Sequence, residues 1–457
     1  MKTIFNFFLL FLPVIVFAQN PPAIPTTQKE WHYLGTPGFS MYNCYEIATD
    51  VSSSGQIYVA YIDDAAYQEV TVQRYDGTDW VNVGSGVISP GGASALSMAI
   101  SPSGEPYVAY CDYSTSYNNG KLMKFDGTNW IYVGGIQGFF NGSPYETKIA
   151  FSPTGEPYIA YVSDYDNHGY VVKFSGNSFV QVGASFSYTS ASYIDMKFSP
   201  GGSPCVSFVD TYHSNKISVL KYDGTDWIYI GLAGFSSNKG AGTSLTFNSA
   251  GDPYIAYYDS PDNTTYSLHV KKLEGSGWID LGNQSFVSGP INLVYACSIA
   301  FDPLGQLYLT SNIQSSTPVS MYNGTSWSNV GANTPNGIYV TLSIFSGLPC
   351  VGFRDPAYSQ KVSVMYYSYP LGIDTNPEQC IQIYPSPVKT NVVIELPGTP
   401  GEIKKLEILD CAGTRMMVLN TCDDKVNLNV GYFSAGTYMV RVRTGSSLFT
   451  EKFVKMD

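Results

Sequence analysis

Aspartate recurs at one position of a repeated phrase in this chain of 457 residues. The phrase reads SGQIYVAYID in one copy and AGDPYIAYYD in another, and the aspartate ends an apolar run typical of a β-strand. A ring of carboxylates could accept hydrogen bonds from sugar hydroxyls or bind a cation. An aspartate at a strand end also caps turns through nearby backbone N–H groups, and recurrence in most copies favours this structural role. The candidates are Asp63, Asp112, Asp164, Asp210, Asp259 and Asp355.

Aromatic residues lie beside these aspartates and in the loops between repeats. Aromatic faces next to carboxylates suit carbohydrate, because sugar C–H surfaces pack on rings while hydroxyls need acceptors. Packing within the loops is the simpler alternative for many of these rings. The ligand-binding candidates beside the aspartates are Tyr113, Tyr165, Tyr212 and Tyr258. The loop residues are Phe139, Phe140, Tyr145, Phe186, Tyr188 and Phe235.

Three acids interrupt the repeat near the start of a strand, namely Glu46, Glu146 and Asp195. Two carboxylates at a suitable separation can act as the acid and base of a glycosidase, so these residues are the catalytic candidates if the protein is an enzyme. Unmatched acids are also common on protein surfaces, which favours a non-catalytic interpretation. The sequence contains no nucleophile elbow, P-loop or HExxH motif.

Asp164 and Asp166 begin a segment with oxygen ligands at alternate positions, as in a calcium-binding loop. His168 and Ser175 then depart from the EF-hand pattern, which excludes an EF-hand. A looser calcium site at these two aspartates is the one metal candidate. We expect no other cofactor.

The elements that would position these residues follow from an internal repeat of about 49 residues. A second phrase, such as RYDGTDWVNVG, lies between copies of the first, and its aromatic residues are Trp80, Trp130, Phe179, Trp227, Trp278 and Trp327. Each period contains four short segments rich in β-branched and aromatic residues, separated by turn residues. Four strands per period of this length predict the blades of a β-propeller. The Asp-Gly of the second phrase predicts a two-residue hairpin turn with positive φ at both positions.

The number of copies predicts how the ring closes. The first phrase occurs seven times, but its last copy is followed by KVSVMYYS and lacks a tryptophan strand. The segment EWHYLG, which contains Trp31, is a tryptophan strand without a preceding blade. We therefore predict seven blades, the last completed by the N-terminal strand, because closure removes exposed sheet edges.

Composition and the N-terminal segment indicate where the protein acts. The net charge of −12 would repel a polyanion, so nucleic acid is not an expected partner. Residues 1–18 combine Lys2, an apolar run and small residues near Ala18, which predicts a cleaved signal peptide. No later segment is long and apolar enough to predict a transmembrane helix.

After the repeats, a Pro-containing polar segment leads into strands that alternate apolar and polar residues. This tail closely resembles the C-terminal sorting domain of proteins exported by the type IX secretion system of Bacteroidetes-like bacteria. The residues that carry the resemblance are Tyr384, Pro385, Pro387, Val388, Gly413, Gly436, Tyr438 and Lys452. The family usually has asparagine where Ser386 stands. The resemblance implies that the type IX machinery is a partner and that the protein is released or anchored at the cell surface.

The sequence thus predicts an all-β protein: a signal peptide at 1–18, a seven-bladed β-propeller at 28–368, a linker at 369–380 and a small Ig-like β-sandwich sorting domain at 381–457. We expect a secreted or cell-surface monomer that serves in binding or adhesion, with an extracellular glycan or a surface protein as partner. The first alternative is a polysaccharide-active enzyme, a glycoside hydrolase or lyase, that uses the propeller funnel. The second is a structural component of the cell surface. Fold class does not choose among these three.

Overall fold

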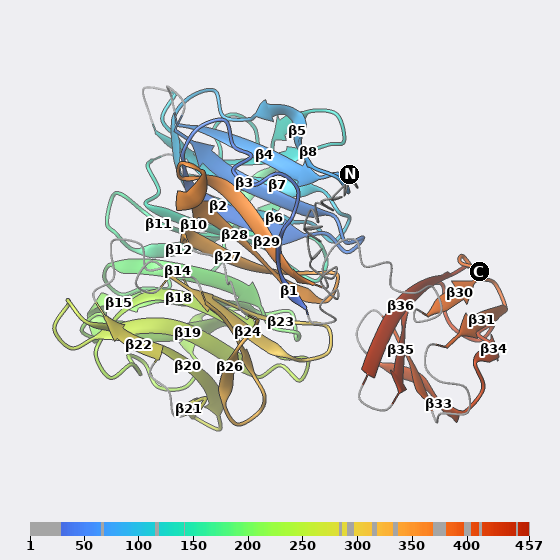
Figure 1. Ribbon diagram of the computed structural model, residues 1–457. Coiled ribbons are helices and arrows are strands. Elements are labelled where there is room, and N and C mark those ends of the chain that lie inside the picture. Colours follow the sequence, from blue (N-terminus) through green and yellow to red (C-terminus); the bar gives the residue numbers. More distant parts are fainter. Residues whose placement is uncertain are drawn as a thin grey trace, which may run out of the picture.

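The computed structural model describes residues 29–456, except 65–67, 115–117, 141, 283–285, 290–296, 313–317, 332–336, 369–380, 397–403, 411–413 and 445–446. The predicted signal peptide, the predicted linker and Gly413 lie outside the described residues. The described chain is built of β-strands, with two short 3-10 turns as its helical elements (Figure 1). Within the described residues, no helix has the length and apolar character needed to cross a membrane.

Seven antiparallel sheets form the blades of a β-propeller, as the repeat predicts. Blade 1 contains β2 (Cys44–Val51), β3 (Ile57–Asp63), β4 (Glu69–Tyr75) and β5 (Trp80–Val87). Blade 2 contains β6 (Ala93–Ile100), β7 (Pro106–Asp112), β8 (Asn119–Phe125) and β9 (Trp130–Tyr132). Blade 3 contains β10 (Glu146–Phe151), β11 (Pro157–Val162), β12 (Gly169–Ser175) and β13 (Ser178–Gln181). Blade 4 contains β14 (Ala191–Phe198), β15 (Pro204–Asp210), the 3-10 turn η1 (Thr211–His213), β16 (Lys216–Tyr222) and β17 (Trp227–Tyr229).

The remaining blades complete the ring. Blade 5 contains β18 (Lys239–Phe247), β19 (Pro253–Ser260), β20 (Tyr266–Glu274), β21 (Gly277–Asp280) and an added strand, β22 (Phe286–Gly289). Blade 6 contains β23 (Cys297–Phe301), β24 (Leu307–Ser311), β25 (Val319–Tyr322) and β26 (Trp327–Asn329). Blade 7 contains β27 (Ile338–Phe345), β28 (Leu348–Asp355), the 3-10 turn η2 (Pro356–Tyr358), β29 (Lys361–Ser368) and the N-terminal strand β1 (Glu30–Tyr33).

The N-terminal strand closes the propeller, which confirms the prediction from the copy count. β1 pairs antiparallel with β29, placing Trp31 opposite Tyr367. Trp31 Nε1 donates a hydrogen bond to the Val330 carbonyl oxygen of blade 6 at 2.7 Å. Trp80 in blade 1 donates in the same way to the Leu34 carbonyl oxygen at 2.6 Å. The N-terminal phrase is therefore bonded to both neighbouring blades, as an internal phrase would be.

The hydrophobic core of the propeller lies between blades. Each pair of neighbouring blades shares one cluster of buried side chains, including the pair formed by blades 7 and 1. Both faces of a middle strand are therefore covered, and the run from Val59 to Ile62 in β3 is buried at every residue. Continuous apolar runs bounded by turn residues are the sequence pattern of such doubly covered strands.

The turns between third and fourth strands differ from the prediction. In blade 1 the loop spans residues 76–79, because Tyr75 pairs with Trp80. Gly77 has a φ of +106°, but Asp76 does not have a positive φ. The Asp76 carboxylate instead accepts hydrogen bonds from the backbone N–H groups of Thr78 and Asp79 at 2.8 and 2.9 Å. The prediction of a two-residue hairpin turn is therefore wrong. The loop is wider, and the side chain of its first residue accepts hydrogen bonds from the backbone N–H groups of the loop.

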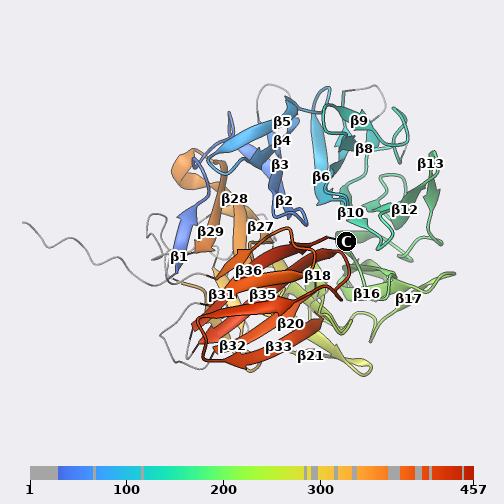
Figure 2. The same ribbon diagram turned by 90° about the vertical axis from the view of Figure 1, so that its right-hand side faces the viewer.

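The tail forms a second body made of two sheets (Figure 2). One sheet has the order β30-β31-β34, and the other has the order β33-β32-β35-β36. Val388, Tyr438 and Phe453 are buried in a core that the two sheets share. The strands are β30 (Gln382–Tyr384), β31 (Asn391–Glu395), β32 (Lys404–Leu409), β33 (Arg415–Thr421), β34 (Lys425–Asn429), β35 (Gly436–Thr444) and β36 (Ser447–Lys455).

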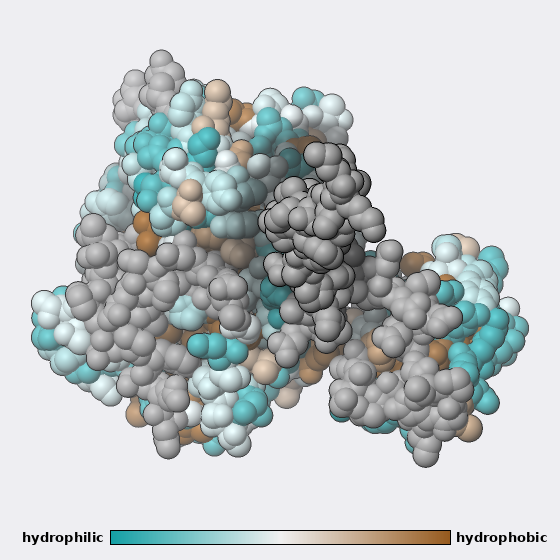
Figure 3. All heavy atoms as spheres, viewed as in Figure 1, coloured by the Kyte–Doolittle hydropathy of each residue, from teal (hydrophilic) through white to brown (hydrophobic). Residues whose placement is uncertain are grey.

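On the face seen in Figure 3, the described residues of both bodies are mostly hydrophilic, with smaller apolar areas between them.

Candidate functional site

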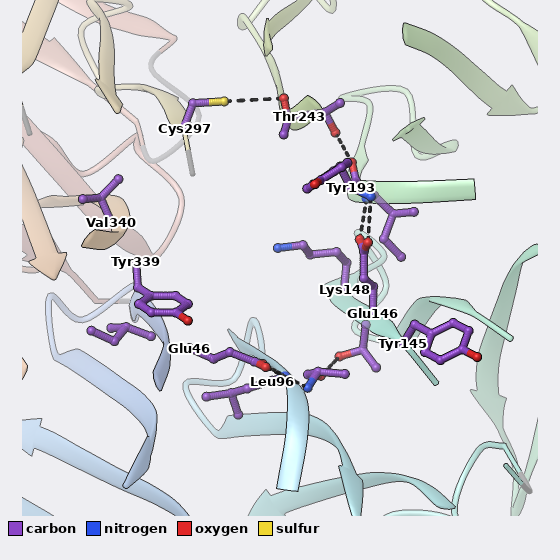
Figure 4. A pocket seen from close by; sticks show the side chains of 15 residues that line it. Glu46, Leu96, Tyr145, Glu146, Lys148, Tyr193, Thr243, Cys297, Tyr339 and Val340 are labelled. Atoms are coloured by element: carbon purple, nitrogen blue, oxygen red, sulfur yellow. Dashed lines mark hydrogen bonds between the residues drawn. The ribbon is translucent and has the colours of Figure 1, made fainter. Parts of the chain in front are cut away.

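A pocket opens on the propeller axis where the innermost strands begin. Its volume is about 420 Å³. Because first strands start and second strands end on this side, the loops after second and fourth strands lie here too, and we call this side the pocket face. The pocket is lined by Glu46, Ile47, Ala95, Leu96, Tyr145, Glu146, Thr147, Lys148, Tyr193, Ile194, Gly242, Thr243, Cys297, Tyr339 and Val340 (Figure 4).

Irregular backbone shapes the pocket wall. The pairing of first and second strands shifts register at the pocket in blades 1, 2, 4, 5 and 7. At each shift one residue has a positive φ: Glu46, Ala95, Tyr193, Gly242 and Tyr339, with values from 42° to 54°. Only one of the five is glycine, so residue type offered little warning of these bulges. Bulges re-aim side chains near functional sites, and here they are placed so that Tyr193 and Tyr339 line the cavity.

The carboxylates of Glu46 and Glu146 each accept hydrogen bonds from the bulge of a neighbouring blade. The two carboxylate oxygens of Glu146 accept hydrogen bonds from the backbone N–H groups of Tyr193 and Ile194, both at 2.8 Å (Figure 4). Glu46 accepts from the Leu96 N–H at 2.5 Å and from the Ala95 N–H at 3.2 Å. Burial raises the pKa of both carboxyl groups, and the backbone hydrogen bonds oppose this shift.

Asp195, the third catalytic candidate, is bonded in a similar way deeper along the axis. Its Oδ2 accepts from the Leu245 N–H of blade 5 at 2.8 Å, and its Oδ1 accepts from the Met196 N–H at 2.9 Å. Asp50 bridges blades 1 and 2 through the Ile100 N–H at 2.8 Å. A catalytic role for Glu46, Glu146 and Asp195 stays a prediction, and it requires carboxylates that also hold backbone amides between blades.

Lys148 is the cationic side chain of the pocket lining. It extends into the open centre of the cavity (Figure 4). Its charge opposes the upward shift that burial gives to the pKa of Glu46 and Glu146, although among the described residues it forms a salt bridge with neither carboxylate. Within the described part of the chain, the Lys148 ammonium has no hydrogen-bond acceptor, so its donors are available to a ligand. Sequence reasoning missed Lys148, because an isolated lysine in a strand carries no motif.

Tyrosines also belong to the lining of this pocket. Tyr145 at the rim is 59% exposed. Tyr339 packs edge-to-face against Tyr45 with ring centroids 6.5 Å apart, and the Arg354 guanidinium lies 5.1 Å from the Tyr45 ring centre. Burial raises the pKa of Tyr339, which keeps its hydroxyl protonated at neutral pH.

The predicted aspartate ring also lies on the pocket face, one strand outward from the axis. Cys44 pairs with Asp63, Ala93 with Asp112 and Ala191 with Asp210. The ring does not converge on the cavity, since none of its members lines the pocket. Five of the six are buried, namely Asp63, Asp112, Asp210, Asp259 and Asp355.

Three of these aspartates have the contacts of turn caps. Asp112, Asp210 and Asp355 each accept from the backbone N–H two residues later, at 2.8, 3.1 and 2.9 Å. Asp259 accepts from the Asn238 N–H at 3.1 Å and lies 3.3 Å from His269 Nε2. A ligand-binding role for the ring stays a prediction, and a ligand would have to compete with these internal donors.

The calcium candidates are separately engaged. Asp164 Oδ2 accepts from the Ser143 N–H at 3.0 Å, and its Oδ1 is buried without a hydrogen-bond partner in the described structure. Asp166 accepts from the His168 N–H at 3.0 Å and from the Tyr170 hydroxyl at 2.7 Å. Among the described residues, no three His, Cys, Asp or Glu side chains group as metal ligands would.

The tyrosine candidates divide into two groups. Tyr113, Tyr165 and Tyr212 are exposed on the pocket face at 43%, 72% and 60%. Tyr258 differs from the expectation, because it is 1% exposed and packs in the core between blades 5 and 6. Of the loop aromatics, Phe139 and Phe186 are buried, whereas Tyr145 and Tyr188 are exposed. Tyr42 and Tyr358 add two exposed rings to this face that sequence reasoning missed.

Comparisons with known proteins identify the tail. Residues 382–456 match the family described as "Secretion system C-terminal sorting domain". The tail is a type IX sorting domain. Type IX export carries this protein to the cell surface or into the medium.

The sorting-domain residues predicted from sequence occupy structural positions in the tail. Val388 is buried, and its N–H donates to the Val454 carbonyl oxygen at 2.8 Å, which joins the motif to the last strand. Tyr438 is buried and donates from its hydroxyl to the Ser434 carbonyl oxygen at 2.9 Å. Tyr384 is exposed and contacts Glu395 and Lys425. Lys452 in β36 pairs with Met439 in β35.

Solved structures share the propeller fold. The BP39L lectin from Burkholderia pseudomallei is 15% identical with a TM-score of 0.52, over 72% of this chain and 99% of the lectin. An ulvan lyase of polysaccharide lyase family PL25, bound to -[GlcA(1-4)Rha3S]-, is 13% identical with a TM-score of 0.50, over 74% of this chain and 95% of the lyase. These likenesses show the fold alone. The comparison with curated proteins found no match to this chain.

Proposed function

We propose that this exported propeller binds carbohydrate in its axial pocket. The observation that carries the proposal is the Lys148 ammonium, which has no acceptor among the described residues and extends into a cavity of about 420 Å³ that Tyr145 and Tyr339 also line (Figure 4). Ligand pockets commonly have volumes of about 300–1,000 Å³. The rings offer faces for sugar C–H surfaces, and the ammonium offers three donors to hydroxyl oxygens.

The hydrogen bonds of Glu46 and Glu146 favour a binding function over a catalytic one. In the catalytic alternative, one carboxyl group would give a proton to the glycosidic oxygen while another acts as base or nucleophile. Both Glu46 and Glu146 already hold two backbone N–H groups of a neighbouring blade. A lectin and a polysaccharide lyase share the fold, so the fold does not choose between the two functions.

A glycan array with the recombinant chain tests the proposal, followed by calorimetric titration of each glycan that binds. Lys148→Met should weaken binding at least tenfold, because the ammonium loses its donors while the aliphatic stem is kept. Lys221→Met is the matched control, since Lys221 lies in β16 opposite Cys205, toward the end of the blade away from the pocket face. Equal affinity of the two variants would contradict the proposal.

The same glycans, incubated with the chain and analysed by chromatography, test the enzyme alternative. Cleavage products that disappear in Glu146→Gln would support catalysis. Unchanged glycans would support a binding function.

A further inference from the structure

Two exposed tyrosines form a paired platform on the pocket face of blade 4. Tyr188 lies in the loop before β14 and Tyr212 lies in η1, so the rings come from separate segments. Their centroids are 5.3 Å apart, with an angle of 39° between the planes. The residues are 70% and 60% exposed. Neither lines the axial pocket.

A buried carboxylate holds one half of this platform in place. Asp210 is 1% exposed, and its Oδ1 accepts from the Tyr212 N–H at 3.1 Å. Its Oδ2 accepts from the Ser218 hydroxyl at 2.8 Å and the Tyr229 hydroxyl at 3.2 Å, and lies 2.8 Å from His213 Nδ1. The His213 ring stands edge-on to Tyr212, with centroids 5.0 Å apart. The turn that presents Tyr212 is therefore anchored before any ligand arrives.

Blade 7 contains the same turn without a platform. Asp355 caps η2 through the Ala357 N–H at 2.9 Å and accepts from the Tyr33 hydroxyl at 3.1 Å. Tyr33 and Tyr358 are edge-to-face at 5.6 Å, as Tyr229 and His213 are at 5.5 Å in blade 4. Both turns end on a serine in the left-handed conformation.

The residue of blade 7 that corresponds to Tyr212 is Ala357, since each provides the N–H that its aspartate caps. The turn therefore does not need an aromatic side chain at this position. The Tyr212 ring is therefore not needed to form the turn. It contacts Tyr188, and both rings remain largely exposed to solvent.

We propose that Tyr188 and Tyr212 bind a pyranose ring of a glycan, at a site separate from the axial pocket. This site shares its ligand class with the proposed function but uses none of the same residues. The C–H face of a pyranose can pack on the two rings, and the turn that carries Tyr212 is already held in place by Asp210. His213 Nε2 has no hydrogen-bond partner in the described structure, and 31% of its side chain is exposed, so it can bond a sugar hydroxyl.

The experiment uses saturation-transfer NMR on the full chain with methyl glycosides of glucose, galactose, mannose, fucose and rhamnose. The variants are Tyr188→Ala and Tyr212→Ala, each made in the parent chain and in Lys148→Met. Tyr212→Ala introduces the residue that blade 7 has naturally, so folding should be retained, and the melting temperature checks this. Tyr432→Ala is the matched control, because Tyr432 is a 69% exposed tyrosine of the sorting domain that packs on Phe433.

We expect a glycoside signal that survives Lys148→Met and falls at least fivefold in Tyr188→Ala and Tyr212→Ala, but not in Tyr432→Ala. If every glycoside signal is unchanged by the two platform variants, the platform proposal is wrong. If the signals that the platform variants leave unchanged are lost in Lys148→Met, the glycosides bind in the axial pocket and the proposed function is supported. If no glycoside gives a signal with the parent chain, the platform proposal is overturned as well, and the glycan array decides the axial site separately.

Discussion

At the scale of single residues, the buried acids of this propeller accept hydrogen bonds from backbone and side-chain donors within the fold. Glu146 spans two blades by accepting from Tyr193 and Ile194, and Asp210 gathers four donors around one buried carboxylate. Hydrogen bonds to charged acceptors are stronger than neutral ones, which makes such residues costly to replace.

Asp210→Asn should lower the free energy of unfolding by about 1–3 kcal/mol, because an amide leaves at least one buried donor without its acceptor. Urea unfolding of the parent and variant chains measures the difference. Asp226→Asn is the control, since the backbone N–H of Asp226 is bonded but its side chain makes no hydrogen bond in the described structure. Unchanged stability together with lost glycan binding would show that Asp210 serves a ligand instead.

Asp259 predicts a pH dependence of stability. Burial alone would raise its pKa, but the hydrogen bond and charge of His269 and the Asn238 N–H outweigh burial and lower the pKa below 3.8. A lowered folded-state pKa gives stability that is present above the ordinary value and is lost as pH falls through the folded value. Asp259→Asn should therefore flatten the loss of stability below pH 3.8, as followed by thermal melts in acid. A parallel loss in both proteins would contradict this.

At the scale of elements, β1 is the strand on which closure depends. Trp31 is 5% exposed and donates a hydrogen bond to blade 6. Trp80 is 8% exposed and donates a hydrogen bond to Leu34, the residue that follows β1. Because the first strands of all neighbouring blades contact each other, including β27 and β2, an opening at blade 7 affects a continuous ring.

Trp31→Ala should destabilise the propeller about as much as Trp80→Ala, by roughly 3–5 kcal/mol, since both remove a buried tryptophan between blades. Chemical denaturation followed by the remaining tryptophans measures both. Deleting residues 28–35 should in addition cause aggregation, because β29 would become an open edge. A deletion variant that melts like the parent and stays monomeric would show that closure does not depend on β1.

At the scale of the whole molecule, the propeller and the sorting domain have separate cores. The tail cluster contains residues 381 to 453 and no propeller residue. Each body can therefore be stable without the other, which suits a tail whose task is export.

Removing the chain from residue 371 onward should leave a folded propeller that stays in the periplasm of a native type IX host. Cell fractionation, with the melting temperature of the purified fragment as the control for folding, tests this outcome. Normal surface display of the truncated chain would contradict the role assigned to the tail.

The order of amino acids was enough to predict the blades, the closing strand and the tail, because each depends on repeated local patterns. The tryptophan phrases recur at a regular interval, and a lone phrase at one end matched a missing strand at the other. The bulges were beyond such reasoning, since Glu46, Ala95 and Tyr339 share no residue type.

The site depended on contacts between segments that are distant in sequence. Glu146 accepts a hydrogen bond from the bulge of the next blade, and the Tyr188 ring contacts the Tyr212 ring from a different loop. Lys148 extends into the pocket and has no acceptor among the described residues. Tyr258 shows the same limit, because its position beside an aspartate did not reveal that its ring turns into the core. Local patterns specify strands, whereas the direction and accessibility of a side chain follow from how the blades pack against each other.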